Sequence, residues 1–144
     1  AVDGSAHSKA VAKYVAANKD FFGKDAKFFL IHVVSDIGLT MLAGVSTGAP
    51  QPLKGADLEA LKEENWKDAS EDVVPILVKA GISFEKVCAE GFAGDTLAKI
   101  AKKKKLDLMV MGSHGYGRFK SAVVGSTAMR ILAKGEVPVL LVRR

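Results

Sequence analysis

The sequence predicts an α/β fold in which an open, parallel sheet carries helices on both faces. Helical and strand-like patterns alternate along the chain, and such alternation is typical of parallel sheets. Two strand-like runs, residues 26–35 and 106–111, are almost continuously apolar, as strands buried on both faces are. The chain has 144 residues, of which 49% are hydrophobic and 26% charged. This is the size and composition of one globular domain, so we expect a single domain over residues 1–144.

The first predicted helix begins at Ser5 or Ser8, either of which could cap it, and ends at Gly23. The buried strand at residues 26–35 follows. Residues 36–56 contain several glycines and two prolines and show no clear period. We therefore expect a loop there, which serves as a lid, a binding loop or a mobile segment.

A second helical pattern begins at Asp57 and ends at Gly81, with a kink or break expected at Pro75. Residues 82–90 alternate apolar and polar side chains, which is typical of a strand nearer the edge of a sheet. A third helix is expected to begin at residues 94–95, and the buried strand at residues 106–111 follows it.

The last predicted helix follows Gly125 and ends at Gly135, and residues 137–142 form the last predicted strand. Pro138 cannot donate a ladder hydrogen bond, which favours an edge or interface position for that strand. Residues 1–5 resemble the end of a strand and its turn. We therefore expect a first, central strand whose earlier residues precede Ala1.

Charge and composition narrow the range of partners. The net charge of +5 permits an anionic ligand, but the basic residues are spread along the chain. The dense run at residues 102–105 is interpreted as the solvated end of a helix, and no aromatic side chain interleaves it to stack on bases, so we expect no nucleic-acid partner. The apolar runs are too short to span a membrane, and we expect no membrane partner. A single cysteine, Cys88, fits a reducing compartment.

Two predicted strand ends carry the chemistry of a binding site. One is the acid and turn at Asp3-Gly4-Ser5, and the other is the glycine-rich run at residues 111–117, which leads to a helix start at residues 125–127. Glycines let backbone N–H groups approach an anion, and a helix start adds unpaired N–H donors. A phosphorylated ligand is therefore predicted at the carboxyl ends of the strands. The alternative is that the glycines only form a turn and that Ser126 and Thr127 only cap a helix.

The spacing of these residues resembles a known signature. Gly112, Gly115 and Gly125, followed by Ser126, match the pattern glycine-x2-glycine-x9-glycine-serine/threonine, which resembles the ATP-binding signature of the universal stress protein family. Residues 2–5, 30–33, 106–115 and 137–142 are also similar to strands of that family, so the resemblance extends over essentially the whole chain.

This resemblance implies an adenine nucleotide alpha-hydrolase-like fold, with five parallel strands in the order 3-2-1-4-5 and the nucleotide between the first and fourth strands. Asp3 would meet adenine or ribose, and Val33 would line the adenine pocket. Met111, Gly112 and Gly115 would frame ribose and phosphates, and Gly125, Ser126 and Thr127 would hold the phosphates. A side chain at position 125 is expected to fill the phosphate space and leave the fold intact.

No paired catalytic groups stand out in the sequence. Three scattered histidines have no metal-ligand spacing, and His114, Arg118, Lys120 and Arg130 are the candidates for charge stabilisation at a γ-phosphate. We therefore expect no catalytic or metal-ligating residues of the protein's own and slow hydrolysis at most.

The predicted function is that of a cytoplasmic ATP-binding stress-response protein, a nucleotide-sensing or regulatory module. ATP is the expected ligand, with AMP or ADP as alternatives and Mg²⁺ or Mn²⁺ as a candidate companion. A homodimer formed through the last strand is also expected, because an exposed apolar edge strand invites aggregation. Two alternatives stay open: an enzyme of the same superfamily that hydrolyses ATP or transfers a nucleotidyl group, and a non-catalytic protein-binding module.

Overall fold

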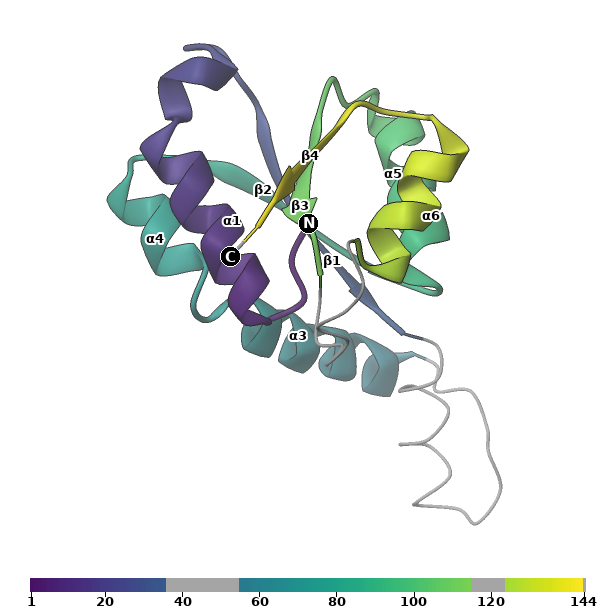
Figure 1. The fold of residues 1–144 in the computed structure, drawn as a ribbon. Coiled ribbons are helices and arrows are strands. Elements are labelled where there is room, and N and C mark those ends of the chain that lie inside the picture. The colour runs from purple at the N-terminus through teal and green to yellow at the C-terminus, as the bar shows by residue number, and fades with distance from the viewer. Residues whose placement is uncertain (36–54, 115–123, 144) are drawn as a thin grey trace.

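The protein was analysed as a computed structural model that describes residues 1–35, 55–114 and 124–143 (Figure 1). The helices are α1 (Ala6–Ala17), the short 3-10 helix η1 (Lys19–Phe22), α3 (Ala56–Ser70), α4 (Val74–Lys79), α5 (Ala93–Lys104) and α6 (Ser126–Lys134). The strands are β1 (Phe28–Val34), β2 (Phe84–Glu90), β3 (Met109–Gly112) and β4 (Val139–Val142). The order confirms the predicted alternation of helices and strands. Most of the predicted loop at residues 36–56, from 36 to 54, lies outside the described residues.

The described strands form two parallel pairs. β1 pairs with β2, with Phe28 opposite Phe84, and β3 pairs with β4, with Met109 opposite Val139. The N-terminal residues lie between the pairs. Val2 forms a parallel bridge with His32, and the Ala1 nitrogen donates to the Val110 carbonyl oxygen at 2.7 Å. Parallel strands are thus confirmed, whereas one continuous five-stranded sheet is not present in the described residues, because the N-terminal segment contributes a bridge rather than a full strand.

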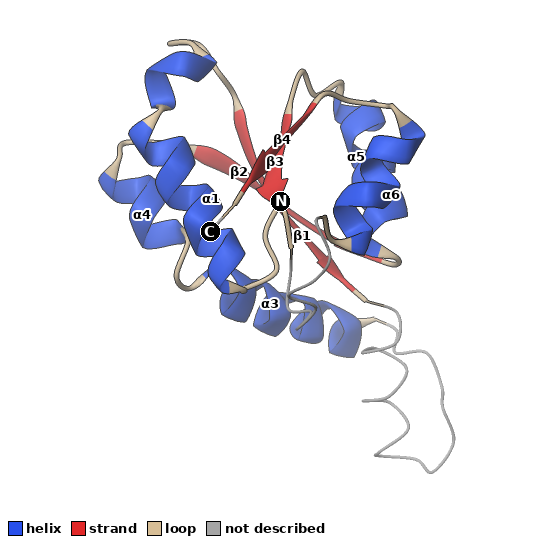
Figure 2. Cartoon of the chain, in the orientation of Figure 1, coloured by secondary structure: helices blue, strands red, loops and turns tan. Residues whose placement is uncertain are grey.

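Helices cover both faces of the strands (Figure 2). Leu30 packs in a hydrophobic cluster with Val11 of α1 and Leu77 of α4. The next residue, Ile31, packs in a second cluster with residues of α5 and α6, including Ile131. Since neighbouring residues of a strand point to opposite faces, β1 is buried on both sides, as its continuous apolar run predicts.

The helix ends follow the local signals in the sequence. The Ser5 side chain caps α1 by accepting a hydrogen bond from the Ser8 N–H at 3.4 Å. The helix itself ends at Ala17, and η1 carries the chain on to Gly23, which adopts a φ of 93°. Residues 71–73 separate α3 from α4, and Pro75 lies in the first turn of α4, where its missing N–H costs nothing. The predicted break is therefore confirmed.

The outer strands and the lysine run also agree with prediction. In the described residues β2 pairs only with β1 and β4 only with β3, whereas β1 and β3 also bond to the N-terminal segment, so β2 and β4 lie at edges. Lys104, near the end of α5, pairs with Glu85 at 2.7 Å and lies over the Phe29 ring, 4.6 Å from its centroid. Lys102 pairs with Glu136 at 3.3 Å. The run at residues 102–105 is therefore the surface end of a helix.

Candidate functional site

A cavity of about 580 Å³, here called the carboxyl-end pocket, lies where β1 and β3 end. This is the position at which open parallel sheets usually bind ligands, and the volume is in the range of small-molecule sites. Seven of the eight residues that the sequence places at the site line this pocket: Asp3, Val33, Met111, Gly112, Gly125, Ser126 and Thr127. The eighth, Gly115, lies outside the described residues.

The polar groups at one side of the pocket belong to the start of α6. The first hydrogen bond inside the helix joins the Met129 N–H to the Gly125 carbonyl oxygen. The N–H groups of Ser126, Thr127 and Ala128 precede it and make no backbone hydrogen bond within the described parts of the chain. Such N–H groups, together with the helix dipole, favour an anion. The arrangement can hold a phosphate group.

Two glycines bring three segments of backbone close together around this helix start. A Cβ atom on Gly112 would lie 2.7 Å from the His7 Cβ and 2.9 Å from the His114 carbonyl oxygen. A Cβ on Gly125 would lie 3.2 Å from the Ser113 carbonyl oxygen and 3.3 Å from the His114 Cα. The sequence predicts that a side chain at position 125 fills the phosphate space. In the structure such a side chain would first press on the backbone that follows β3.

Asp3 supplies the carboxylate of the pocket, and α1 holds it in place. Its Oδ1 atom accepts hydrogen bonds from the Ser5 N–H at 3.0 Å and from the Ser8 hydroxyl at 2.7 Å. Among the described residues that line the pocket, Asp3 is the one carboxylate. The acceptor predicted from the sequence is thus present in the lining of the pocket.

Apolar side chains form the remaining walls. Val33 lies near the end of β1, and Met111, which is 6% exposed, lies on β3. Sequence reasoning placed these two and missed Leu97 of α5, Val124 and Ser8, which also line the pocket. Leu97 has the helical spacing of a core residue, so nothing else in the sequence indicates that it lines a pocket. Ser8 was read only as a possible cap.

Two histidines meet beside the pocket. His7 on the first turn of α1 and His114 after β3 have ring centroids 5.7 Å apart, and His114 Nδ1 lies 3.1 Å from the Ser113 hydroxyl oxygen. The sequence predicts each position separately but not the pair, because 107 residues separate them. In the described residues no group of three or more His, Cys, Asp or Glu side chains is placed to hold a metal ion.

The helices behind the pocket are joined by an ion-pair network. Asp95 of α5 contacts Arg130 at 2.7 Å and Lys134 at 3.0 Å, both on α6. The hydrogen bond from Arg130, followed by that from Lys134, lowers the pKa of the Asp95 carboxyl below its ordinary value. Arg130 therefore forms a contact that joins α5 to α6. From the sequence it is a candidate for charge stabilisation at a γ-phosphate.

Cys88 lies on β2, away from the lining of the pocket. Burial raises the pKa of its thiol, and its Sγ lies 3.7 Å from the Lys62 carbonyl oxygen. A raised pKa leaves less thiolate at neutral pH, which agrees with a packing role rather than that of a nucleophile.

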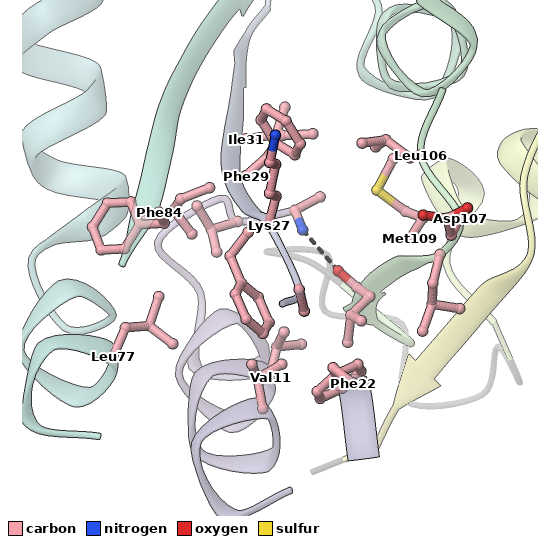
Figure 3. Close-up of a pocket in the computed structure, with 18 of the residues that line it drawn as sticks. Val11, Phe22, Lys27, Phe29, Ile31, Leu77, Phe84, Leu106, Asp107 and Met109 are labelled. Carbon is pink, nitrogen blue, oxygen red and sulfur yellow. Dashed lines mark hydrogen bonds between the residues drawn. The ribbon is translucent and has the colours of Figure 1, made fainter. Parts of the chain in front are cut away.

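A second hollow, of about 600 Å³, lies between β1 and β3 toward the start of each strand and is here called the amino-end groove. Figure 3 shows Phe29 and Ile31 on one side, Leu106 and Met109 on the other, and Val11 of α1 across its base. It is somewhat larger than the carboxyl-end pocket, but its lining is mostly apolar and includes no helix start. Three lysines, Lys27, Lys104 and Lys105, also line the groove, whereas the backbone N–H donors of a helix start, which suit a phosphate group, are in the carboxyl-end pocket.

Comparison with known proteins decides the family. Residues 1–143 match the Universal stress protein family. The chain belongs to the universal stress protein family. Universal stress protein MJ0531 of Methanocaldococcus jannaschii is 32% identical over 146 aligned residues, which cover 99% of this chain and 78% of that protein. Universal stress protein Slr1230 of Synechocystis sp. is 31% identical over 106 residues, which cover 73% of this chain and 37% of that protein.

Solved structures of universal stress proteins and related chains share the fold. The structure of protein MJ0577, described as a structure-based assignment of biochemical function, has a TM-score of 0.75 at 24% identity and covers 97% of this chain and 90% of its own. A universal stress protein in complex with cAMP has a TM-score of 0.55 at 20% identity, with 98% and 91% of the two chains covered. These likenesses confirm the α/β fold. No helix in the described parts of this family member is long and apolar enough to cross a membrane.

Proposed function

We propose that this universal stress protein binds an adenine nucleotide in the carboxyl-end pocket and acts as a nucleotide-sensing or regulatory module in the stress response. The observation that carries the proposal is that one cavity of about 580 Å³ is lined both by the start of α6 and by the Asp3 carboxylate. A nucleotide has matching parts, since its phosphates are anionic and its nucleoside carries hydroxyl and amino donors.

The lining divides naturally between these two parts. Gly125, Ser126 and Thr127 would hold phosphates through N–H and hydroxyl groups, and Gly112 would frame ribose and phosphates. Asp3 would accept a hydrogen bond from the ribose or the adenine, and Val33 and Met111 would pack against apolar surface of the ligand. Gly115 is proposed, from the family signature, to take part in the same phosphate loop.

ATP is the ligand we propose, with AMP and ADP as alternatives. The signature spacing supports ATP, and the likeness to a universal stress protein crystallised with cAMP supports an adenine nucleotide in general. Any accompanying Mg²⁺ or Mn²⁺ would be held largely by the phosphates. Hydrolysis would be slow at most, because Asp3, the one carboxylate among the described lining residues, would bind the nucleoside and not the γ-phosphate.

We further propose that residues 1–144 form one domain whose strands follow the order 3-2-1-4-5. The bridge between Val2 and His32 and the hydrogen bond from Ala1 to Val110 support this order, because they join the N-terminal segment to both β1 and β3. The amino-end groove offers the space for such a strand. A homodimer through the outer edge of β4, and a cytoplasmic location, complete the proposal.

The test begins with the protein as purified. The protein is denatured, the small molecules that it releases are identified by mass spectrometry, and its affinities for ATP and for inorganic tripolyphosphate are measured by calorimetry. We expect a bound adenine nucleotide and binding of ATP. Asp3→Asn should weaken ATP binding, whereas Asp72→Asn, a matched change of a carboxylate that lies 65% exposed outside the pocket lining, should leave it unchanged.

Each other outcome has a clear meaning. Absence of any released nucleotide together with no measurable ATP binding would overturn the proposal and favour a protein-binding module. Release of inorganic phosphate or AMP from ATP well above background, with Mg²⁺ or Mn²⁺ present, would overturn the regulatory assignment in favour of an enzyme of the same superfamily.

A further inference from the structure

Asp3 and Ser8 are joined by two hydrogen bonds. The Asp3 N–H donates to the Ser8 hydroxyl oxygen at 2.9 Å, and that hydroxyl donates to Asp3 Oδ1 at 2.7 Å. Ser8 is 4% exposed, so its hydroxyl is shielded from water that could compete for these bonds. The two residues therefore fix each other's orientation.

The first turn of α1 departs from the usual reciprocal cap. In that arrangement the side chain three residues after the cap reaches back to the cap residue's N–H. Here the Ser5 N–H donates instead to Asp3 Oδ1 at 3.0 Å, while the Ser5 side chain accepts from the Ser8 N–H. Because Asp3 satisfies the N–H of the cap residue, the Ser8 hydroxyl is not needed for capping and is directed at the carboxylate.

These contacts make the two carboxylate oxygens different. Oδ1 accepts two hydrogen bonds, which is the capacity of its two lone pairs. Within residues 1–35, 55–114 and 124–143, no hydrogen bond is made to Oδ2, and both Asp3 and Ser8 line the carboxyl-end pocket. Oδ2 is thus the oxygen left for a ligand.

We infer that Ser8 is a positioning residue that presents the Asp3 carboxylate to the nucleoside part of a bound nucleotide, and so determines how strongly this pocket prefers a nucleotide to a bare phosphate chain. The inference rests on the proposed function. Ser8 does not act on the phosphates, because the phosphate donors are at the start of α6. Loss of its hydroxyl should free the carboxylate to turn, and recognition of the nucleoside should weaken while phosphate binding stays.

The test compares ATP with inorganic tripolyphosphate on four proteins: wild type, Ser8→Ala, Asp3→Asn and the double variant. Ser8→Ala should weaken ATP binding by about tenfold, which is typical for loss of a hydrogen bond to a charged group, and should leave tripolyphosphate affinity within about twofold of wild type. Added to Asp3→Asn, the same change should have no further effect on ATP binding, because there is no carboxylate to orient. Melting temperatures of all four proteins report on folding.

Ser8→Cys is a second variant that keeps the shape of the side chain, with a larger terminal atom, and weakens the donor. It should lose ATP affinity in the same direction as Ser8→Ala. Equal losses for ATP and tripolyphosphate, additive effects of Asp3→Asn and Ser8→Ala, or failure of both Ser8 variants to fold would assign Ser8 to the fold and overturn the inference. If wild type binds tripolyphosphate but no ATP, the proposed function fails as well. If wild type prefers ATP and Ser8→Ala keeps that preference, this inference alone fails.

Discussion

His7 and Gly112 approach so closely that a methyl group on Gly112 would lie 2.7 Å from the His7 Cβ. His7 belongs to the first turn of α1 and Gly112 to the end of β3, so the contact sets how near α1 comes to the strand that leads into the candidate phosphate loop. The glycine is needed for space rather than for an unusual backbone conformation, since it is not among the glycines with positive φ.

Gly112→Ala is therefore expected to destabilise the protein. The added methyl would also lie 2.9 Å from the His114 carbonyl oxygen, and relief requires a shift of backbone. Overpacking of this kind costs about 1–3 kcal/mol. Urea unfolding measures the change in the free energy of unfolding. Ser126→Ala, an exposed position on α6, serves as the control and should change it by no more than about 0.5 kcal/mol. Equal stability of the two variants would contradict the crowding at Gly112.

Gly125→Val is expected to reduce ATP affinity by about tenfold or more, because its side chain would press on the backbone of Ser113 and His114 and displace the N–H donors of α6. Calorimetry with ATP provides the measurement. Gly135→Ala is the matched control at the other end of the same helix, where nothing lies within 4 Å but φ is +61°. It should lower stability through backbone strain and leave ATP affinity unchanged. Equal ATP affinities of Gly125→Val and wild type would remove Gly125 from the phosphate site.

Asp95 should make stability depend on pH in the acid range. The contacts from Arg130 and Lys134 lower its pKa in the folded protein below the ordinary value of 3.8. The unfolded chain therefore takes up a proton first as the pH falls, and the stabilisation is complete above about pH 3.8 and is lost as pH falls further through the folded pKa. Melting temperatures measured down to pH 2 should fall less steeply in Asp95→Asn than in wild type below that pH. Parallel curves would show that the carboxylate contributes nothing through this pair of cations.

The amino-end groove should accept an added strand. On the groove side, the described part of β1 is met by the bridge at Val2 and His32, and no described strand pairs with Phe28–Leu30 there. An extension of four or five β-branched residues placed before Ala1 is expected to pair with β1 and β3 and to raise the melting temperature by about 4 °C or more. An extension of equal length made of glycine and serine should not. Equal melting temperatures of the two extended proteins would argue against the proposed five-stranded order.

The layered fold could be predicted because a strand that is buried on both faces is a nearly continuous apolar run. β1 is such a strand, and its neighbours Leu30 and Ile31 pack in opposite clusters. Helix ends could also be predicted from local signals, as the cap at Ser5 and the break near Pro75 show. Most of the candidate site was also predictable, because the carboxyl ends of parallel strands lie together and the glycine spacing marks the helix start that follows.

Other features depend on contacts that no local pattern records. The pairing of Ser8 with Asp3 requires the turn at Gly4 to fold back, and a serine near a helix start is read as a cap whatever its hydroxyl contacts. The meeting of His7 with His114 depends on the packing of α1 against β3. The reason for a glycine at position 125 differs from expectation, because a Cβ there would meet the backbone of Ser113 and His114.

Both ends of α6 are tied to the same strand. Its N-terminal end is held where the Gly125 N–H donates to the Ser113 carbonyl oxygen at 2.6 Å, and its other end leads into β4, which is hydrogen-bonded to β3. Within the described residues, the hydrogen bond to Ser113 and the pairing of β4 with β3 thus fix the helix start relative to the strands. A substitution that shifts β3 or its pairing with β4 would therefore move the start of α6, and the N–H groups of Ser126, Thr127 and Ala128 with it.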